Sequence, residues 1–502
     1  MAGLRWPDAQ ELLVLLLGLL LVCYLIRARM SNKLPPGPSA WWQLVNIFSS
    51  DRKPPHIQLE QYRKRYGDVT TLYILWMPII LLSGFQTIQE ALIQYSREFA
   101  GRPRTRINDL LTKCQGIIYA PYGRSWKQQR RFTLTILRNF GLGTITFEEK
   151  ILEEAKYLID TLKAPLEGQA ADPRPVITSA VSNVMCMIIF GRRFHYEDKT
   201  FKHLVGLYDQ MLRIHSGFWM RICAVFPIIL YLPGPQQRIF ENQAAILAIL
   251  QGFIEQHRET LSGETIRDFI DAYLLEMEKE RDGSPDSMLT EGNLLHDIHD
   301  LFLGGTETTS TTLYWGLLYM MAYPDVQVKC QKEIDEVIGR SRRPSMEDSS
   351  DMPYVSAVIH EVQRYANIFP VSVVRAMTQD TAFMGHQIKK DTLVLINLYS
   401  ALTDEGQWKH PHQFNPENFL NDSGEFFKPD AFIPFSMGVR ACLGERLAKM
   451  ELFLFFTSLL QHLEFHWPDA TTSPNLEGQY KIVVEPQPYE MLVRRRETLG
   501  DL

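Results

Sequence analysis

Apolar residues recur at intervals of three and four positions along most of the chain, the spacing that places them on one face of an α-helix. The pattern is clearest in four segments, residues 147–162, 239–261, 266–279 and 450–463. Short apolar and β-branched runs instead predict strands at residues 69–75, 79–83, 392–396 and 481–484. Because helical segments cover far more of the chain than strands do, the sequence predicts a mainly α fold with minor β.

One predicted helix is exceptionally long. Residues 291–322 follow Thr290, a candidate N-cap, and contain no proline, so the helix would extend about 48 Å. Its middle holds the adjacent Gly304 and Gly305, each of which costs about 1 kcal/mol relative to alanine. Two explanations stay open: close packing against another helix, or a flat or bulky group against this face. Gly304 and Thr308 share that face because they are four residues apart.

An uninterrupted apolar run at residues 12–26 predicts a membrane anchor. A cleaved signal peptide is the alternative, but Asp8 and Glu11 accompany a single Arg5, and no small-residue cleavage site follows the run. Basic residues come after it: Arg27, Arg29 and Lys33. By the positive-inside rule, the N-terminus would be lumenal and the body cytosolic.

The rest of the chain shows no internal repeat and no Gly/Ser-rich linker. We therefore expect an anchor over residues 1–29, a basic and Pro-rich elbow over 30–39, and one large domain over 40–502. The formal net charge is -6, so binding to nucleic acid is not expected. Six cysteines scattered over 502 residues do not form a disulfide framework and favour a body in the reducing cytosol.

One cysteine, Cys442, lies in a loop suited to chemistry. Residues 435–445 read Phe-Ser-Met-Gly-Val-Arg-Ala-Cys-Leu-Gly-Glu, and a helical pattern begins at about residue 443. The N–H groups at a helix N-terminus stabilise a thiolate, and Arg440 adds positive charge. We interpret the other five cysteines as inert.

The loop resembles the haem-binding signature of the cytochrome P-450 family. The matching residues are Phe435, Gly438, Arg440, Cys442, Gly444 and Ala448. Three further segments match family motifs in order and spacing: residues 304–309 (Gly-Gly-Thr-Glu-Thr-Thr), Glu361-x-x-Arg364 and Trp126-x-x-x-Arg130. Together with the anchor and the elbow, the resemblance covers essentially the whole chain and is strongest to vertebrate microsomal members of family 2.

The resemblance implies a P-450 fold, with the long central helix over haem b and one transmembrane helix before the domain. Cys442 would be the axial iron ligand, which favours O–O cleavage. Thr308 and Glu307 would be the catalytic pair that handles protons, and Gly304 would leave room for O2. The remaining cofactor contacts, including guanidinium groups for the haem propionates, would be Arg102, Trp126, Arg130, Arg375, Phe435, Arg440 and Gly444.

Glu361 and Arg364 lie one helical turn apart and can pair, which indicates a structural role. The family completes this pair with a third residue, and Asn418 stands here where arginine or histidine is usual. By resemblance, the substrate pocket draws on five dispersed segments, which indicates a largely apolar site for lipophilic molecules. Its candidate residues include Ile117, Asp300, Phe302, Val371, Val374, Tyr480 and Ile482.

Asp300 lies one turn before Gly304, and a carboxylate beside an apolar pocket needs a partner. Either it accepts backbone N–H groups from the loop at residues 104–119, or it pairs with a basic nitrogen of a cationic substrate. We favour the first alternative because the pocket segments are mostly neutral.

The sequence shows no nicotinamide, flavin or nucleotide-binding motif, so electrons from NADPH would come through a partner protein. The resemblance implies an NADPH–cytochrome reductase, with cytochrome b5 as a second candidate partner. We predict a monooxygenase in the endoplasmic reticulum membrane, single-pass, with its catalytic domain facing the cytosol. The alternatives are a haem-thiolate hydroperoxide isomerase and a non-catalytic haem carrier or sensor.

Overall fold

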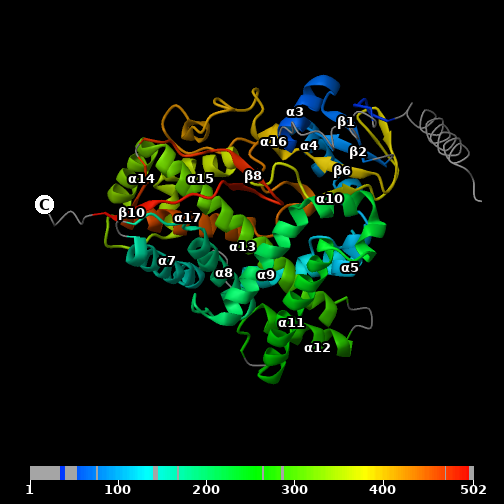
Figure 1. Cartoon of the computed structure of the whole chain (residues 1–502), viewed down its shortest axis with the longest axis horizontal. Coiled ribbons are helices and arrows are strands. Elements are labelled where there is room, and N and C mark those ends of the chain that lie inside the picture. Colours follow the sequence, from blue (N-terminus) through cyan, green and yellow to red (C-terminus); the bar gives the residue numbers. More distant parts are fainter. Residues whose placement is uncertain are drawn as a thin grey trace, which may run out of the picture. The chain divides into compact units, whose positions relative to one another are not determined.

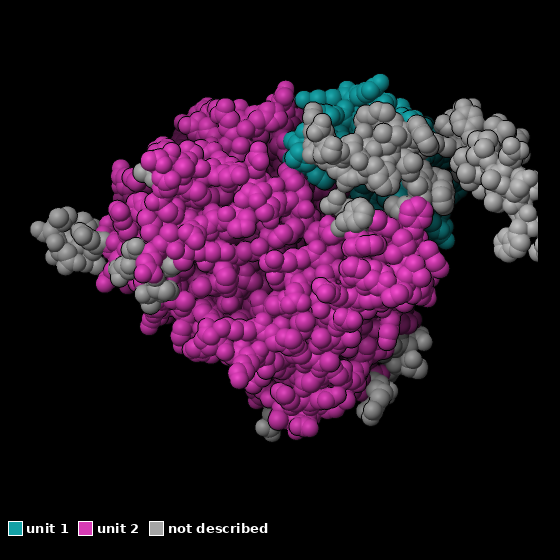
Figure 2. All heavy atoms as spheres, viewed as in Figure 1, with its two compact units in different colours: residues 1–101, 373–396 teal, residues 102–372, 397–502 magenta. Residues whose placement is uncertain are grey.

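The computed structural model describes residues 34–39, 54–74, 77–139, 145–166, 169–262, 265–283, 288–469 and 471–496. The chain forms two compact units, coloured separately in Figure 2. Unit 1 comprises Met1–Gly101 and Val373–Ile396, and unit 2 comprises Arg102–Ser372 and Asn397–Leu502. Unit 1 is therefore assembled from two stretches far apart in the sequence, and no linker marks its edges.

Unit 1 is built on a four-stranded sheet in the order β1-β2-β6-β3. Its strands are β1 (Val69–Ile74), β2 (Met77–Leu82), β3 (Arg375–Ala376) and β6 (Leu393–Ile396). Strand β2 pairs antiparallel with β1 and parallel with β6. Its residues Ile80, Leu81 and Leu82 are fully buried, which explains why it reads as a continuous apolar run.

The other elements of unit 1 are one helix of 12 residues, α3, and several shorter pieces. They are α3 (Pro55–Tyr66), α4 (Phe85–Gln89), η1 (Glu90–Gln94), η2 (Glu98–Ala100), β4 (Thr381–Phe383) and β5 (His386–Ile388). The described part of the Pro-rich elbow is not helical. It is tied to β1, because the Thr71 N–H donates to the Pro36 carbonyl at 2.9 Å. Gly37 allows this approach, since a Cβ there would lie 1.9 Å from the Thr71 carbonyl oxygen.

Unit 2 contains most of the helices (Figure 1). They are α5 (Arg106–Thr112), α6 (Arg124–Asn139), α7 (Ile145–Leu166), α8 (Arg174–Ile189), α9 (Lys199–Ser216), α10 (Phe218–Val225), η3 (Pro227–Tyr231), η4 (Pro235–Gln237), α11 (Arg238–Glu259), α12 (Phe269–Gly283), α13 (Glu291–Ala322), α14 (Pro324–Val337), η5 (Met346–Ser350), α15 (Pro353–Ala366), α16 (Leu398–Leu402), η6 (Pro416–Phe419), η7 (Gly438–Arg440) and α17 (Glu445–His462). Two small sheets complete it: β7 (Leu463–His466) with β10 (Leu492–Arg495), and β8 (Gly478–Tyr480) with β9 (Val484–Pro486).

The long helix α13 is the centre of unit 2 and confirms the prediction for residues 291–322. Thr290 is its N-cap, with its side-chain oxygen accepting the Asn293 N–H at 3.2 Å, and Pro324 begins the next helix. Helices α8, α11, α15 and α17 all pack on it, and Figure 1 shows α13 between α8 and α17. Most of its side chains are buried, so packing on several sides stabilises this helix.

The segment 147–162 lies within α7, and the segments 239–261, 266–279 and 450–463 each run one to three residues past one end of α11, α12 and α17. The strands predicted at residues 69–75, 79–83 and 392–396 are β1, β2 and β6. The strand predicted at residues 481–484 is wrong, because residues 481–483 form the turn between β8 and β9. The Lys481 N–H donates to the Val483 carbonyl there, which reverses the chain where the apolar run suggested extension.

The predicted anchor lies outside the described residues. In the part of the chain that the structure describes, no helix is both long enough and apolar enough to cross a bilayer.

Candidate functional site

The Cys442 loop makes two tight turns before α17. Ser436 and Gly438 adopt positive φ angles of 59° and 74°, and the Cys442 N–H donates to the Phe435 carbonyl at 2.9 Å. Gly444 is the N-cap of α17, which begins at Glu445. The sulfur therefore lies just before the first turn of a helix, as the sequence predicted.

The environment of Cys442 acts on its thiol in opposite directions. Burial raises the pKa of the thiol, while the backbone N–H groups of Gly444 and Glu445 and the cation of Arg130 lower it. The net shift is upward, so the loop alone does not make the thiolate that we predicted. The positive charge that lowers the pKa of the thiol comes from Arg130 and not from Arg440, and the Glu445 carboxylate opposes it. A metal cation would supply the missing stabilisation, because a coordinated thiol loses its proton.

The Cys442 side chain is exposed although surrounding protein atoms raise the pKa of its thiol. An enclosed thiol that keeps accessible surface has room beside it for a ligand. The donor type, the helix N-terminus and this accessibility together fit a cysteine-ligated metal cofactor.

The two central glycines of α13 have different roles. A Cβ added at Gly305 would lie 2.3 Å from the Met185 sulfur on α8, whereas one added at Gly304 would meet no atom within 4 Å. Close helix packing therefore explains Gly305, and open space beside the helix explains Gly304. The Thr308 hydroxyl lies one turn on and donates to the Gly304 carbonyl at 2.7 Å.

Glu307 is nearly buried, with its side chain 12% exposed, and it lies 3.6 Å from Arg174 at the start of α8. Burial and the neighbouring Glu485 carboxylate raise the pKa of Glu307 to about 7, against the opposing effect of Arg174. Its carboxyl group can therefore both release and accept a proton near neutral pH. Arg174 and Glu485 were not predicted, because they are distant in the sequence and belong to no motif.

Two of the predicted propionate ligands meet at one carbonyl. Trp126 Nε1 and Arg440 Nη1 both donate to the Ile117 carbonyl, at 3.1 and 3.2 Å. Arg440 also donates to the Ala120 carbonyl at 2.8 Å, and its guanidinium lies 3.9 Å from the centre of the Trp126 ring. The structure thus brings together two residues that only the family motifs connected.

Two further cations lie close to these segments. Arg102 Nε donates to the Ile118 carbonyl at 2.7 Å, and Arg130 Nη2 donates to the Ala441 carbonyl next to Cys442 at 2.7 Å. Burial lowers the pKa of Arg102 to about 10 and also lowers that of Arg130. An anionic group beside these buried guanidinium groups would be favoured, which fits haem propionates.

Arg375, the remaining predicted propionate ligand, belongs to unit 1. It is buried and donates from Nη1 to the Phe99 carbonyl at 3.3 Å. Its role toward a cofactor stays a prediction.

Asp300 accepts two backbone hydrogen bonds through one oxygen. The N–H groups of Ile117 and Ile118 donate to its Oδ2 at 2.7 and 2.8 Å, the geometry of the structural alternative. Burial raises the pKa of Asp300 to about 6, although both N–H groups and Arg102 lower it. The carboxylate therefore holds the loop at Ile117 and Ile118 in place. A substrate contact at Asp300 stays a prediction.

Two replacements of Asp300 distinguish the effect of its charge from the effect of its hydrogen-bond acceptor. Asp300→Asn keeps an acceptor for both N–H groups and should leave stability close to that of the parent protein. Asp300→Ala leaves two buried donors without an acceptor, which costs about 1–3 kcal/mol for each. Denaturant unfolding and hydrogen exchange at Ile117 and Ile118 measure both effects. Equal protection of these amides in Asp300→Ala would contradict the structural role, and selective loss of amine binding in Asp300→Asn would indicate the substrate role.

The Glu361–Arg364 pair is fully buried on α15, with Arg364 Nε 2.7 Å from Glu361 Oε2. Asn418 completes the trio, because its Nδ2 lies 3.2 and 3.3 Å from the two Glu361 oxygens. The amide thus takes the place that the family usually gives to arginine or histidine. Arg364 also donates to four backbone carbonyls, those of Leu402, His410, Pro411 and Gln413.

One predicted substrate residue, Phe302, has a polar pair of side chains beside it. Phe302 is buried on α13 and stacks on Tyr208 of α9, with ring centres 4.9 Å apart. The Tyr208 hydroxyl is hydrogen-bonded to His299 Nδ1 at 2.9 Å, a polar pair that the sequence did not reveal. Burial lowers the pKa of His299 to about 3, so its ring is neutral.

The other predicted substrate residues lie in several elements. Ile117 is buried in the loop before α6, and Val371 forms an isolated bridge to Asn397. Tyr480 ends β8, and Ile482 lies in the following turn with 38% exposure. Val374 belongs to unit 1. Their contact with a substrate stays a prediction.

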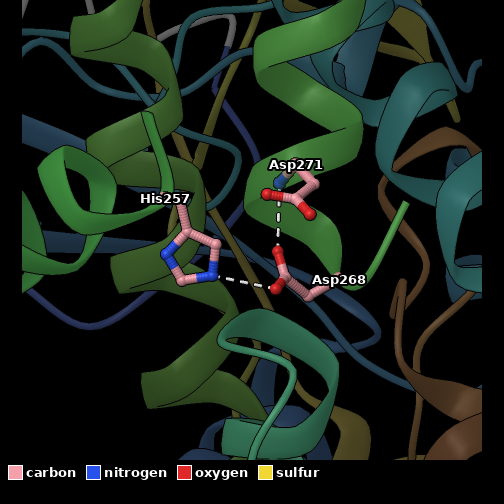
Figure 3. Close-up of side chains that lie close together, drawn as sticks. All are labelled: His257, Asp268 and Asp271. Carbon is pink, nitrogen blue, oxygen red and sulfur yellow. Dashed lines mark hydrogen bonds and ion pairs between the residues drawn. The ribbon is translucent and has the colours of Figure 1, made fainter. Parts of the chain in front are cut away.

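Figure 3 shows His257, Asp268 and Asp271, whose ligand atoms lie within 4.8 Å of one another. His257 Nε2 is 2.8 Å from Asp268 and Nδ1 is 2.6 Å from the Phe253 carbonyl, so both ring nitrogens face acceptors. Both oxygens of Asp271 bind Arg267, at 2.6 and 2.8 Å. Each group already has a protein partner. We therefore interpret the cluster as a set of ion pairs that connects α11 with the start of α12.

Comparisons with known proteins agree with this site. The sequence profile of the family described as Cytochrome P450 matches residues 35–493. The chain is 42% identical to human cytochrome P450 2D6 over 469 residues, which cover 93% of this chain and 94% of that protein. It is 44% identical to human cytochrome P450 2J2 over 459 residues, 91% of each chain. It is 39% identical to rat cytochrome P450 2D4 over 502 residues, 98% of this chain and all of that protein.

Proposed function

The chain belongs to the cytochrome P450 family, and we propose that this haem-thiolate monooxygenase would bind haem iron through the Cys442 sulfur. It would insert one atom of O2 into lipophilic small molecules such as fatty acids, steroids or xenobiotics. The observation that carries the assignment is the accessible Cys442 thiol at the N-terminus of α17, next to the N–H groups of Gly444 and Glu445. When bound, thiolate-ligated haem supplies dioxygen activation.

The residues of this chain would hold the cofactor and manage protons. Arg102, Trp126, Arg130 and Arg440 provide donors for the propionate carboxylates, with Arg375 as a further candidate. Gly304 leaves open space beside α13. The Glu307 carboxyl group exchanges a proton near neutral pH. Once the Thr308 hydroxyl releases the Gly304 carbonyl, it would donate its proton toward the open space beside Gly304 and take a replacement from Glu307 through water.

Electrons from NADPH would arrive through a cytochrome reductase, with cytochrome b5 as a second donor. Lys127 and Arg131 on α6 and Arg446 on α17 are exposed cations, and they are the candidate contacts for an acidic partner. Turnover that depends on reductase and NADPH tests this part of the proposal. A hydroperoxide isomerase would act without reductase, and a carrier or sensor would form no product.

We place the protein in the endoplasmic reticulum membrane, with its catalytic domain facing the cytosol. Exposed apolar side chains after α10 support a second contact with the bilayer, namely Phe226, Ile228, Tyr231 and Leu232. Such a contact suits the entry of lipophilic substrates.

Replacing Thr308 should separate electron use from product formation. In Thr308→Ala, haem content and NADPH consumption should persist, product should fall by roughly a hundredfold, and hydrogen peroxide should appear instead. Thr312→Ala is the matched control, because the Thr312 hydroxyl makes the same type of bond, to the Thr308 carbonyl at 2.8 Å. An unchanged ratio of product to NADPH in Thr308→Ala would rule out the proton role.

A further inference from the structure

Glu307 is part of a buried ion-pair network that joins four elements. Arg174 Nη2 on α8 lies 3.6 Å from Glu307, and Arg174 Nη1 lies 2.6 Å from Glu485 on β9. Lys481, in the turn between β8 and β9, lies 2.5 Å from the same Glu485 carboxylate. The side chains of Glu307 and Glu485 are only 12% and 3% exposed, so solvent screens these charges weakly.

The remaining charged groups near the network are engaged elsewhere. Asp209 on α9 lies 4.0 Å from Arg174 but 2.8 Å from Arg213, its partner one turn along the helix. Asp172 accepts the Arg174 backbone N–H at 2.8 Å and the Tyr314 hydroxyl at 3.3 Å. These contacts fix the start of α8 and leave the Arg174 guanidinium between the two glutamates.

The two glutamates share the cations unequally. Glu485 has two cations at 2.6 and 2.5 Å, whereas Glu307 has one at 3.6 Å. A carboxylate is stabilised most by the nearest cations, so a proton taken up by the network goes to Glu307. The pKa of Glu307, raised to about 7 by burial and by Glu485, agrees with this geometry.

We propose that Arg174 and Glu485 are positioning residues for proton supply, because they compete for one guanidinium and thereby set the charge of Glu307 beside Thr308. Lys481 links this competition to the turn between β8 and β9. Two proposed substrate contacts are the sequence neighbours of Lys481: Tyr480 at the end of β8 and Ile482 in the turn. A substrate that displaces the turn weakens the hold of Lys481 on Glu485, and Arg174 then moves its charge toward Glu485. The inference rests on the proposed function only for the use of the Glu307 proton.

The charge of Glu307 can be followed without turnover. In the full-length holoenzyme, the infrared C=O stretch of the protonated carboxyl group is assigned by its loss in Glu307→Gln and titrated with pH. Arg174→Gln removes a cation, so the midpoint should rise by about one pH unit. Lys481→Gln should also raise it, by a smaller amount. Glu485→Gln removes the competing anion, so the midpoint should fall.

Opposite signs distinguish this network from a general loss of structure. Arg174→Lys retains the charge and should stay closer to the parent midpoint than Arg174→Gln. Arg267→Gln breaks the ion pair with the buried Asp271 and is the control, with no expected shift. Shifts of Arg174→Gln and Glu485→Gln in the same direction, or no shift in either, would overturn the inference. The titration reads Glu307 itself, so a failed monooxygenase assignment leaves its result interpretable.

Discussion

Glu361→Leu should lower the free energy of unfolding by about 3–5 kcal/mol, because it leaves the Arg364 guanidinium buried without its carboxylate. Both side chains have no exposed surface, and Glu361 also accepts the Asn415 backbone N–H at 2.8 Å. The loss is a large part of the 5–15 kcal/mol that typically separates folded from unfolded protein. The variant should therefore express poorly and retain less haem.

The exposed pair of Lys389 and Asp380 is a matched control for Glu361→Leu. Its atoms are 2.6 Å apart, yet the side chains are 74% and 56% exposed. Asp380→Ala should lower the free energy of unfolding far less than Glu361→Leu does, since solvent screens an exposed pair. Chemical denaturation of both variants gives the comparison. A loss in Glu361→Leu no larger than that in Asp380→Ala would show that the buried trio is not a principal source of stability.

The sequence predicted what depends on local pattern. The bounds of α13 follow from a capping threonine, an apolar periodicity and a following proline. The Glu361–Arg364 pair follows from i, i+3 spacing on one helix, and Asn418 was located by its place in a motif. The helix start after Cys442 follows from glycines in a loop that precedes an apolar stripe.

What the sequence did not predict depends on contacts between distant segments. Arg174 and Glu485 belong to no motif, and only folding brings them to Glu307. The bond between Tyr208 and His299 likewise joins two helices. The prediction of a strand at residues 481–484 was wrong because an apolar run can also form a turn when some of its side chains are buried. Unit 1 is built from two separate stretches of chain, and no local pattern in the sequence marks such an assembly.

Cys442→His should reduce NADPH-dependent product formation to the level seen without enzyme. A thiolate donates electron density that imidazole does not, and this density favours O–O cleavage. The change also removes the only cysteine of this loop, whose sulfur lies next to the N–H groups of Gly444 and Glu445. Cys114→His is the control, because Cys114 lies in the loop after α5 and has no part in the proposed cofactor site.

The reduced carbonyl complex tests the central assignment most directly. Carbon monoxide bound to ferrous haem gives a strongly red-shifted Soret band only when a thiolate occupies the opposite axial position. The parent protein and Cys114→His should show this band. Cys442→His should bind haem without it. Persistence of the red-shifted band in Cys442→His would contradict the assignment of Cys442 as the iron ligand.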